Sequence, residues 1–291
     1  MKKIYVSLTE KQATFLHDNP DFDVDGCFSH ALDNEINKRI YKNENINVVI
    51  AAAGYDERAS MINNEIPKAM LKIKGKSILE RQIDIFRGFG IDDITVVRGY
   101  KKEEINLTGV NYIDNDRFSE TGIFYSFSLA AEKITGKTIL CYADILFEKD
   151  VVDRLLNSTS DIAIIVDKSW RDHYHDRLQH TMGEAELVEK KDGLISRIGT
   201  GLPAESAYGE FIGLAAFSIM GAKAAKKLFE ELKETSVPSA YQALDKPTAS
   251  LSDFFNALIM SGVKICSVDI LGGWFEIDTF EDYRKSWVMV P

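Results

Sequence analysis

Hydrophobic positions along the chain follow two spacings. Short apolar runs such as 48–51, 94–97 and 138–141 alternate with longer stretches, for example 77–89, in which apolar residues recur every three or four positions. The short runs are typical of buried strands, and the longer stretches are typical of helices with one apolar face. This alternation, from residue 45 onward, predicts an α/β fold: a mostly parallel mixed sheet with helices on both faces.

The same alternation continues along the chain and then changes. The further expected helices are 121–131, 149–156, one that runs through Leu228, and 252–260, and the further expected strands are 162–166, 211–217 and 264–268. After Trp170, short polar strands at 185–188 and 194–196 are joined by Asp192-Gly193, a dipeptide typical of hairpin turns. These strands predict a small β insertion on the substrate side of the sheet.

The first 45 residues have a different pattern. An alternating apolar run from 4 to 8 precedes a capping box at 9–12, and a second helix is expected from about 25 to 42. This order resembles a ribbon-helix-helix unit. It predicts an N-terminal extension at 1–45 that packs on a larger domain at 46–291 or joins two copies of the chain as a homodimer. Six Lys and Arg against eight Asp and Glu in the extension argue against DNA binding.

Composition limits the classes of protein that fit. With 291 residues, 45% of them hydrophobic, the chain can bury a large core. A formal net charge of −10 argues against a nucleic-acid partner, because phosphate contacts need clustered Lys and Arg. No run approaches the ~20 apolar residues of a membrane span, and the first residues are too polar for a signal peptide, so we expect a cytoplasmic protein. The spacing of Cys27, Cys141 and Cys266 predicts neither a disulfide nor a zinc site.

A loop of small residues follows the first strand of the expected sheet. Ala51-Ala52-Ala53-Gly54 ends this strand at the carboxyl edge, where ligands bind in parallel sheets. Small side chains let a nucleobase and phosphates approach the backbone, whose amide groups can donate hydrogen bonds. Arg58 and Lys68 add two positive charges suited to a triphosphate. On residue types alone, the loop and its cations could equally form a solvated turn.

Two carboxylates lie at other expected strand ends. Asp144 follows one strand, and Asp278 follows an apolar run just before an expected helix, so each could instead be a turn or capping residue. Together they fit Mg²⁺, which is held by one or two carboxylates plus phosphate oxygens. His173, His175 and His180 match no helical ligand spacing, and we expect these histidines to be exposed.

Taken in order, these motifs resemble the nucleotidyltransferases of the sugar-phosphate and phosphocholine type. The matching runs are Ala52-Ala53-Gly54 with Arg58, Pro67-Lys68, Gly75 to Arg81, Asp144, Gly209 to Leu214 and Trp274 to Thr279. The resemblance covers about 47–288 and implies a Rossmann-like, glycosyltransferase-A-like sheet. The last two runs are most similar to cytidylyltransferases of phosphonate biosynthesis, such as 2-aminoethylphosphonate cytidylyltransferase, and to the related phosphocholine enzymes.

The resemblance also suggests which residues bind an acceptor. The candidates are Trp170, Tyr174, Arg177, Glu210, Trp274 and Glu276. The first three combine aromatic rings with a cation just beyond a strand, and their alternative is a packed aromatic beside surface charges. The last three could hold an ammonium head group through charge and cation–π contact, although Trp274 could equally belong to the core.

Two further features concern the part of the chain that is expected to bind the nucleotide. Asn115 and Thr121 precede an expected helix, where they could contact base or ribose, or cap the helix. Asp56 stands where the family loop usually has a second glycine. A carboxylate at that position repels a triphosphate unless Mg²⁺ intervenes.

The sequence therefore predicts an enzyme that transfers CMP from CTP to a small phosphonate or to phosphocholine and releases pyrophosphate. The phosphonate would be 2-aminoethylphosphonate or 2-hydroxyethylphosphonate. Mg²⁺ would bind Asp144 and Asp278, while Lys68 and Arg58 stabilise charge on the α-phosphate and the leaving pyrophosphate. One alternative is a sugar-1-phosphate nucleotidyltransferase that uses UTP or another nucleotide. The other is a non-catalytic nucleotide-binding regulatory protein, which Asp56 would favour.

Overall fold

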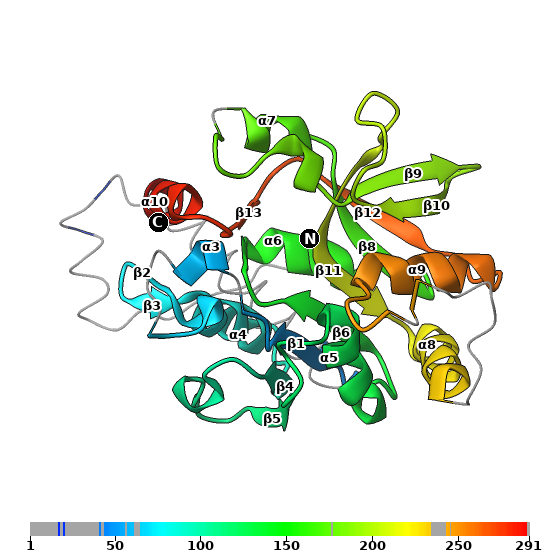
Figure 1. Ribbon diagram of the computed structural model, residues 1–291, viewed down its shortest axis with the longest axis horizontal. Coiled ribbons are helices and arrows are strands. Elements are labelled where there is room, and N and C mark those ends of the chain that lie inside the picture. The colour runs from blue at the N-terminus through cyan, green and yellow to red at the C-terminus, as the bar shows by residue number, and fades with distance from the viewer. Residues whose placement is uncertain are drawn as a thin grey trace.

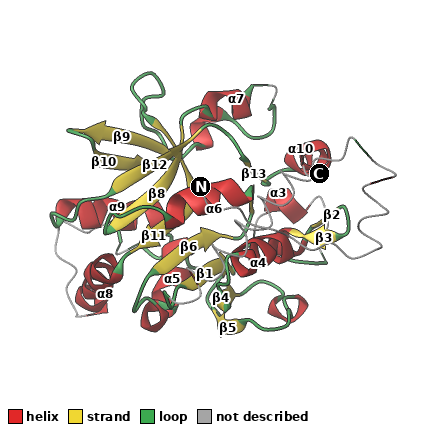
Figure 2. Ribbon diagram, turned by 180° about the vertical axis from the view of Figure 1, so that it is seen from behind, coloured by secondary structure: helices red, strands yellow, loops and turns green. Residues whose placement is uncertain are grey.

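A mixed nine-stranded sheet runs through the described part of the protein, and helices cover both of its faces (Figure 1 and Figure 2). The computed structural model describes residues 17, 20, 41, 44–55, 57–60, 65–175, 177–233, 243–244 and 246–289. Nearly all of the expected extension at 1–45 lies outside these residues, as do Cys27 and Asp56.

The parallel part of the sheet is built around β1 (Asn47–Ala52). This strand pairs in parallel with β4 (Asp93–Arg98) on one side and with β6 (Thr138–Tyr142) on the other. β4 in turn pairs in parallel with β5 (Asn111–Asp114). Because parallel strands share one direction, the carboxyl ends of β1, β4 and β6 meet at the same edge of the sheet.

The antiparallel pairs gather around β11 (Gly209–Phe217). It pairs with β6, with β8 (Ile162–Asp167) and with β9 (Leu187–Lys191). β9 continues into β10 (Leu194–Gly199), and β12 (Cys266–Ile270) adds in parallel to β8. The predicted mixed sheet is confirmed.

The predicted hairpin of the β insertion is also present. β9 and β10 are antiparallel, and the turn residues Asp192 and Gly193 have φ values of 51° and 81°. Positive φ at both positions is what a type I′ hairpin turn requires. The first strand begins two residues later than expected, because Ala185 closes a 3₁₀ turn over Met182–Glu184.

Six of the described α-helices lie close to the expected ranges: α4 (Ile78–Gly88), α5 (Ile123–Leu129), α6 (Lys149–Leu156), α8 (Ile219–Lys233), α9 (Leu251–Met260) and α10 (Phe280–Met289). Two short helices, α3 (Glu57–Ser60) and α7 (Trp170–Tyr174), were not predicted. The expected capping box begins α4, since Oγ of Ser77 accepts from the Glu80 amide and Glu80 accepts from the Ser77 amide. Among these helices none combines the length and apolar character that a membrane span needs.

Alternate residues of β1 belong to two separate hydrophobic cores. Ile50 belongs to the core that contains Phe86 of α4, and Val49 belongs to the core that contains Phe127 of α5. All four side chains are fully buried. Successive side chains of a strand point to opposite faces of the sheet. One core therefore packs between the sheet and the helices α4 and α6, and the other between the sheet and α5, α8 and α9.

Several short elements were not predicted. β7 (Ile145–Phe147) pairs with β13 (Trp274–Glu276), and β2 (Lys72–Ile73) pairs with β3 (Lys76–Ser77). Runs of two or three residues are too short to have a recognisable period. The β7–β13 pair matters most, because it brings the segment around β13, near the C-terminal end of the sequence, to the carboxyl edge of β6.

Gly213 inside β11 is expected to be essential for stability. It has φ +82°, and a β-carbon there would come 2.3 Å from Cδ2 of Tyr142. We expect Gly213→Ala to lower the free energy of unfolding by about 2–5 kcal/mol, as left-handed strain costs about 1–2 kcal/mol and overpacking about 1–3. Gly193→Ala is the matched control, because Gly193 has φ +81° but no atom of the described residues lies within 4 Å of an added β-carbon. Equal losses in urea unfolding would contradict the steric explanation.

Candidate active site

A cavity of about 400 Å³ opens at the carboxyl ends of β1 and β6. This volume is in the range of small-molecule sites. Every residue that the sequence assigned to the nucleotide lines it: Ala51, Ala52, Ala53, Gly54, Asn115 and Thr121. Arg58, Lys68 and Asp144 line it as well. The structure therefore brings the loop, both cations and one carboxylate together around one space.

The loop after β1 is supported from behind by the end of β4. The amide of Tyr100 donates to the carbonyl of Ala53 at 2.9 Å. Gly99 packs so closely that an added β-carbon would come 2.6 Å from the Ala53 carbonyl oxygen and 2.6 Å from Cβ of Phe118. This contact holds the backbone of the loop in place without a side chain between them.

Asn115 and Thr121 are bonded to each other. Nδ2 of Asn115 donates to Oγ1 of Thr121 at 3.1 Å and to Ser126 at 3.2 Å, and its Oδ1 accepts from the Arg117 amide at 3.0 Å. Neither residue caps α5, whose N-cap is Gly122. Asn115 therefore shapes the wall of the cavity from a buried position.

Lys68 bridges the two carboxylates that the sequence singled out. Its Nζ lies 2.9 Å from Oδ2 of Asp144 and 2.6 Å from Oδ1 of Asp278. Asp144 lies in the turn between β6 and β7, and Asp278 follows β13. The amide of Ile277 donates to the Asp144 carbonyl at 3.0 Å, which joins the two segments. The β7–β13 pair thus positions both carboxylates.

Arg58 of α3 reaches the same carboxylate from the other side. Its Nη2 donates to Oδ2 of Asp278 at 3.1 Å, and its Nη1 pairs with Glu184. Burial alone would raise the pKa of Asp278, but Lys68, His180 and Arg58 outweigh it and hold the pKa at about 2. Asp278 is therefore an anion held among cations.

The acceptor candidates Tyr174 and Glu210 form a buried pair. The hydroxyl of Tyr174 donates to Oε1 of Glu210, while Oε2 of Glu210 is buried and has no hydrogen-bond partner among the described residues. Burial raises the pKa of Glu210 to about 8, although the Tyr174 hydrogen bond lowers it. Burial together with Asp278 and Asp144 likewise raises the pKa of Glu276 well above its ordinary value.

Arg177 is fixed inside the protein. Its Nη2 donates to the Glu276 carbonyl at 3.1 Å, its Nε lies 3.0 Å from Oδ1 of Asp282, and its guanidinium lies 4.5 Å from the ring centre of Phe275. Only 2% of the side chain is exposed. These contacts give Arg177 the role of holding β13 against α10.

The two tryptophans among the acceptor candidates are buried. Trp170 is fully buried in a core cluster with Tyr174 and Leu187, which favours the alternative of a packed aromatic. Nε1 of Trp274 donates to Oδ2 of Asp167 at 2.8 Å, and its ring lines a separate cavity of about 960 Å³. Neither ring lines the cavity that contains Lys68.

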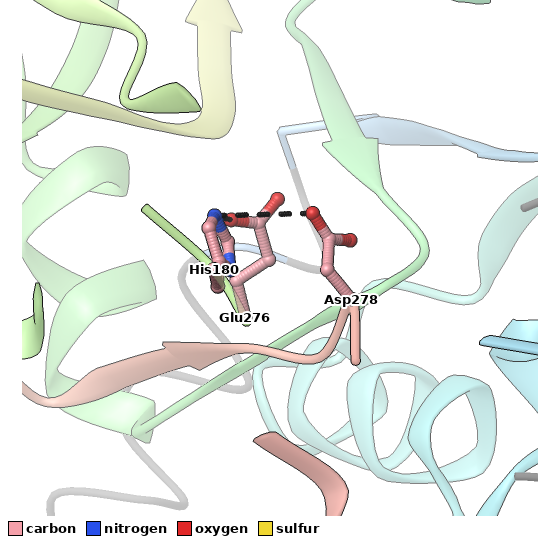
Figure 3. Close-up of side chains that lie close together, drawn as sticks. All are labelled: His180, Glu276 and Asp278. Atoms are coloured by element: carbon pink, nitrogen blue, oxygen red, sulfur yellow. Dashed lines mark ion pairs between the residues drawn. The ribbon is translucent and has the colours of Figure 1, made fainter. Parts of the chain in front are cut away.

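His180 is the functional candidate that sequence reasoning missed. The expectation that it is exposed was wrong, because only 1% of its side chain is accessible. Its Nδ1 lies 3.3 Å from Oδ2 of Asp282, and its Nε2 lies 3.6 Å from Glu276 and 3.9 Å from Asp278 (Figure 3). The polar stretch around it gave no periodic signal of burial. Of the other two histidines, His175 is exposed as expected and His173 is half-buried beside Asp167 at 2.9 Å.

A comparison with protein-family profiles shows which family the chain belongs to. The profile of the MobA-like NTP transferase domain matches residues 48–210, more than half of the chain. The chain belongs to this family. The matched part of this NTP transferase domain contains the loop, Lys68 and Asp144, and Glu276 and Asp278 come from the chain beyond it.

Individual relatives extend the match along the chain. CTP:phosphoglutamine cytidylyltransferase of Campylobacter jejuni is 28% identical over 249 residues, which cover 81% of this chain and 97% of that protein. 2-Aminoethylphosphonate cytidylyltransferase of Lancefieldella rimae is 28% identical over 201 residues, 66% of this chain and 75% of that protein. The structure of CTP:phosphocholine cytidylyltransferase from Streptococcus pneumoniae superposes with a TM-score of 0.64 at 19% identity, over 85% of this chain and 100% of that chain. This likeness confirms the Rossmann-like fold of the NTP transferase domain.

Glu210 is expected to make stability depend on pH. An unfolded glutamate loses its proton near pH 4.5, whereas folded Glu210 keeps it to about pH 8. Between these values the folded state holds one more proton, so the free energy of unfolding falls as pH rises, by up to about 1.4 kcal/mol per pH unit. Glu210→Gln keeps an oxygen for Tyr174 but cannot ionise, so it should remove this component of the slope in urea unfolding. Glu205→Gln, at an exposed position, should retain it.

Proposed function

We propose that this NTP transferase domain transfers CMP from CTP to a small acceptor that carries a phosphate or phosphonate, with release of pyrophosphate. The observation that carries the proposal is Lys68, within 3 Å of both Asp144 and Asp278, at the wall of a cavity of nucleotide size. The names of the relatives support cytosine as the base, since each of the three described above is a cytidylyltransferase.

The residues around the cavity have separate parts in this reaction. The 51–54 loop would bind base and phosphates through its backbone amides, and Lys68 would stabilise charge that develops on the α-phosphate. Arg58 would bind the leaving pyrophosphate. An ionised oxygen of the acceptor forms a bond to the α-phosphorus, and the bond from that phosphorus to pyrophosphate breaks. Since the attacking oxygen is already ionised near neutral pH, positioning matters more than a strong general base.

Asp144 and Asp278 fit a Mg²⁺ ion. Oδ1 of Asp144 is buried and has no hydrogen-bond partner in the described part of the chain, and Asp278 supplies a second carboxylate beside it. A pair of carboxylates next to phosphate oxygens is the donor set that Mg²⁺ prefers. When bound, this ion would neutralise phosphate charge and orient the triphosphate.

For the acceptor, we propose a phosphate or phosphonate that also carries a nitrogen group. Glu210 has one buried oxygen without a hydrogen-bond partner among the described residues, and Glu276 stands near a second carboxylate. A cationic nitrogen beside these glutamates would favour their ionised forms and pair with them. 2-Aminoethylphosphonate and phosphocholine have such a group. 2-Hydroxyethylphosphonate lacks it and should be the weaker acceptor.

Pyrophosphate release tests the choice of nucleotide and acceptor together. We would assay CTP, UTP, ATP and GTP with Mg²⁺, each against 2-aminoethylphosphonate, 2-hydroxyethylphosphonate, phosphocholine, phosphoglutamine and glucose-1-phosphate. Turnover should need CTP, favour an acceptor with nitrogen, and stop when EDTA removes the metal. Turnover with UTP and glucose-1-phosphate would replace the proposal with a sugar-1-phosphate nucleotidyltransferase. Binding of CTP with no turnover across the panel would favour a regulatory protein.

Lys68→Ala and Asp144→Asn test the roles of the bridge. We expect each variant to lose at least about a hundredfold in kcat, because a group that stabilises developing charge contributes about that much. Lys76→Ala is the control, since Lys76 is an exposed lysine paired with Asp84 at 2.7 Å outside the cavity. A folded Lys68→Ala enzyme with the turnover of the control would rule out the assigned role.

A further inference from the structure

A glutamine interrupts the apolar face of α4. The buried residues of this helix are Ile78, Leu79, Gln82, Ile83 and Phe86, a spacing that places them on one side of the helix. Gln82 is polar, whereas the other four are apolar, and only 1% of Gln82 is exposed. A buried amide costs free energy unless its groups find hydrogen-bond partners. The partners of Gln82 therefore show what it contributes at this position.

Both hydrogens of the Gln82 amide bind the turn that carries Asp144. Nε2 donates to the carbonyl of Tyr142 at 2.8 Å and to the carbonyl of Ile145 at 2.7 Å. Tyr142 is the last residue of β6 and Ile145 is the first residue of β7, so Asp144 lies between the two bonded carbonyl groups. The reverse orientation of the amide would place Oε1 against two carbonyl oxygens, which cannot donate a hydrogen bond.

The oxygen of the same amide is buried without a partner. Among the described residues no group donates to Oε1 of Gln82. An unpaired buried acceptor is costly, and an apolar side chain of the same length would avoid that cost. What the amide contributes here is therefore its two donors, which hold the backbone on either side of Asp144.

The other contacts of the turn leave this part of the backbone unsecured. The carbonyl of Asp144 accepts the amide of Ile277 at 3.0 Å, and its Oδ2 lies 2.9 Å from Nζ of Lys68. The thiol of Cys141 also donates to the Tyr142 carbonyl, at 3.1 Å, but a thiol is a weak donor. Gln82 thus provides the strong contact that joins the two ends of the turn.

We propose that Gln82 is a positioning residue for Asp144, because its amide fixes the 142–145 turn and with it the direction of the Asp144 carboxylate. This inference rests on the proposed function, in which Asp144 would hold Mg²⁺ beside the triphosphate. It gives α4 a part in the reaction, although residues 78–88, all of them described, do not line the cavity. A reacting group displaced by about 1 Å can lower a rate a hundredfold, so such support has a large effect.

Gln82→Met provides the kinetic test, because it keeps the length of the side chain and removes both donors. Ile83→Val is the matched control, a change at the next buried residue of the same helix. In the CTP assay described above, we expect Gln82→Met to lower kcat about 10–100-fold, as the loss of a residue that supports a metal ligand does. The KM for CTP should change less than about twofold, since binding in the ground state is not altered. A kcat equal to that of Ile83→Val would overturn the inference.

Hydrogen exchange provides a second measurement, which does not depend on catalysis. The amide of Ile277 donates to the Asp144 carbonyl, so its exchange reports whether the turn stays docked on the segment after β13. In Gln82→Met this amide should exchange at least about tenfold faster, while the amides of Val49 in β1 and Val96 in β4 keep their rates. Equal acceleration of all three amides would mean a general loss of stability and would reject the positioning role.

The wild-type protein can be tested without any substitution. The side-chain amide hydrogens of Gln82 should exchange slowly with D₂O, because both donate inside the protein. The side chain of Gln179, at an exposed position, is the internal reference. Exchange of the Gln82 side chain as fast as that of Gln179 would contradict the two hydrogen bonds, even if Gln82→Met does not fold.

These measurements separate the inference from the proposed function. If the wild type releases no pyrophosphate from CTP but Gln82→Met accelerates exchange at Ile277 alone, the proposed function fails and the positioning of Asp144 by Gln82 stands. If the wild type turns over CTP and Gln82→Met matches Ile83→Val in both kcat and exchange, the proposed function stands and the role of Gln82 is rejected.

Discussion

One ammonium group holds together two carboxylates from distant parts of the chain, and the candidate active site depends on it. Lys68 lies within hydrogen-bond distance of both Asp144 and Asp278, and all three side chains are largely covered by protein. Two carboxylates this close would repel each other without a cation. The bridge also joins the side of the cavity that is built on β1 and β6 to the last strand and helix of the domain. A change at any of the three charges therefore affects both sides.

The acidic groups around the bridge are divided into charged and neutral ones by their surroundings. Asp278 is an anion because three cationic or proton-bearing groups outweigh its burial. Glu210 and Glu276 are driven toward the neutral form, since burial and neighbouring carboxylates dominate there. The same residue type thus has opposite protonation behaviour within one site. This division keeps negative charge on Asp278, beside Lys68 and Arg58, and reduces it on the more deeply buried glutamates.

The first turn of α10 holds Asp278, one carboxylate of the Lys68 bridge, in position. Asp282 accepts the amides of Asp278 and Thr279 and faces both Arg177 and His180. A carboxylate at the first turn of a helix stabilises the unpaired amides there. In this protein the same group also fixes the position of Asp278 and the ring of His180. The cap of a helix has therefore become part of the support of the site.

By itself the sequence determined the elements with a clear period and the motifs local to them. Strands such as β1, the capping box of α4 and the hairpin at Asp192-Gly193 follow from patterns within a few turns of chain. The grouping of the 51–54 loop with Lys68 and Asp144 could be predicted because strand ends of a parallel sheet share one edge, and because the order of the motifs resembles a known family. Only the tertiary structure decided the pairing of β7 with β13, the burial of His180 and the place of Trp170 in the core. Each of these depends on contacts between segments far apart in the chain. A three-residue strand or a polar stretch has no period that reveals which distant side chains will cover it.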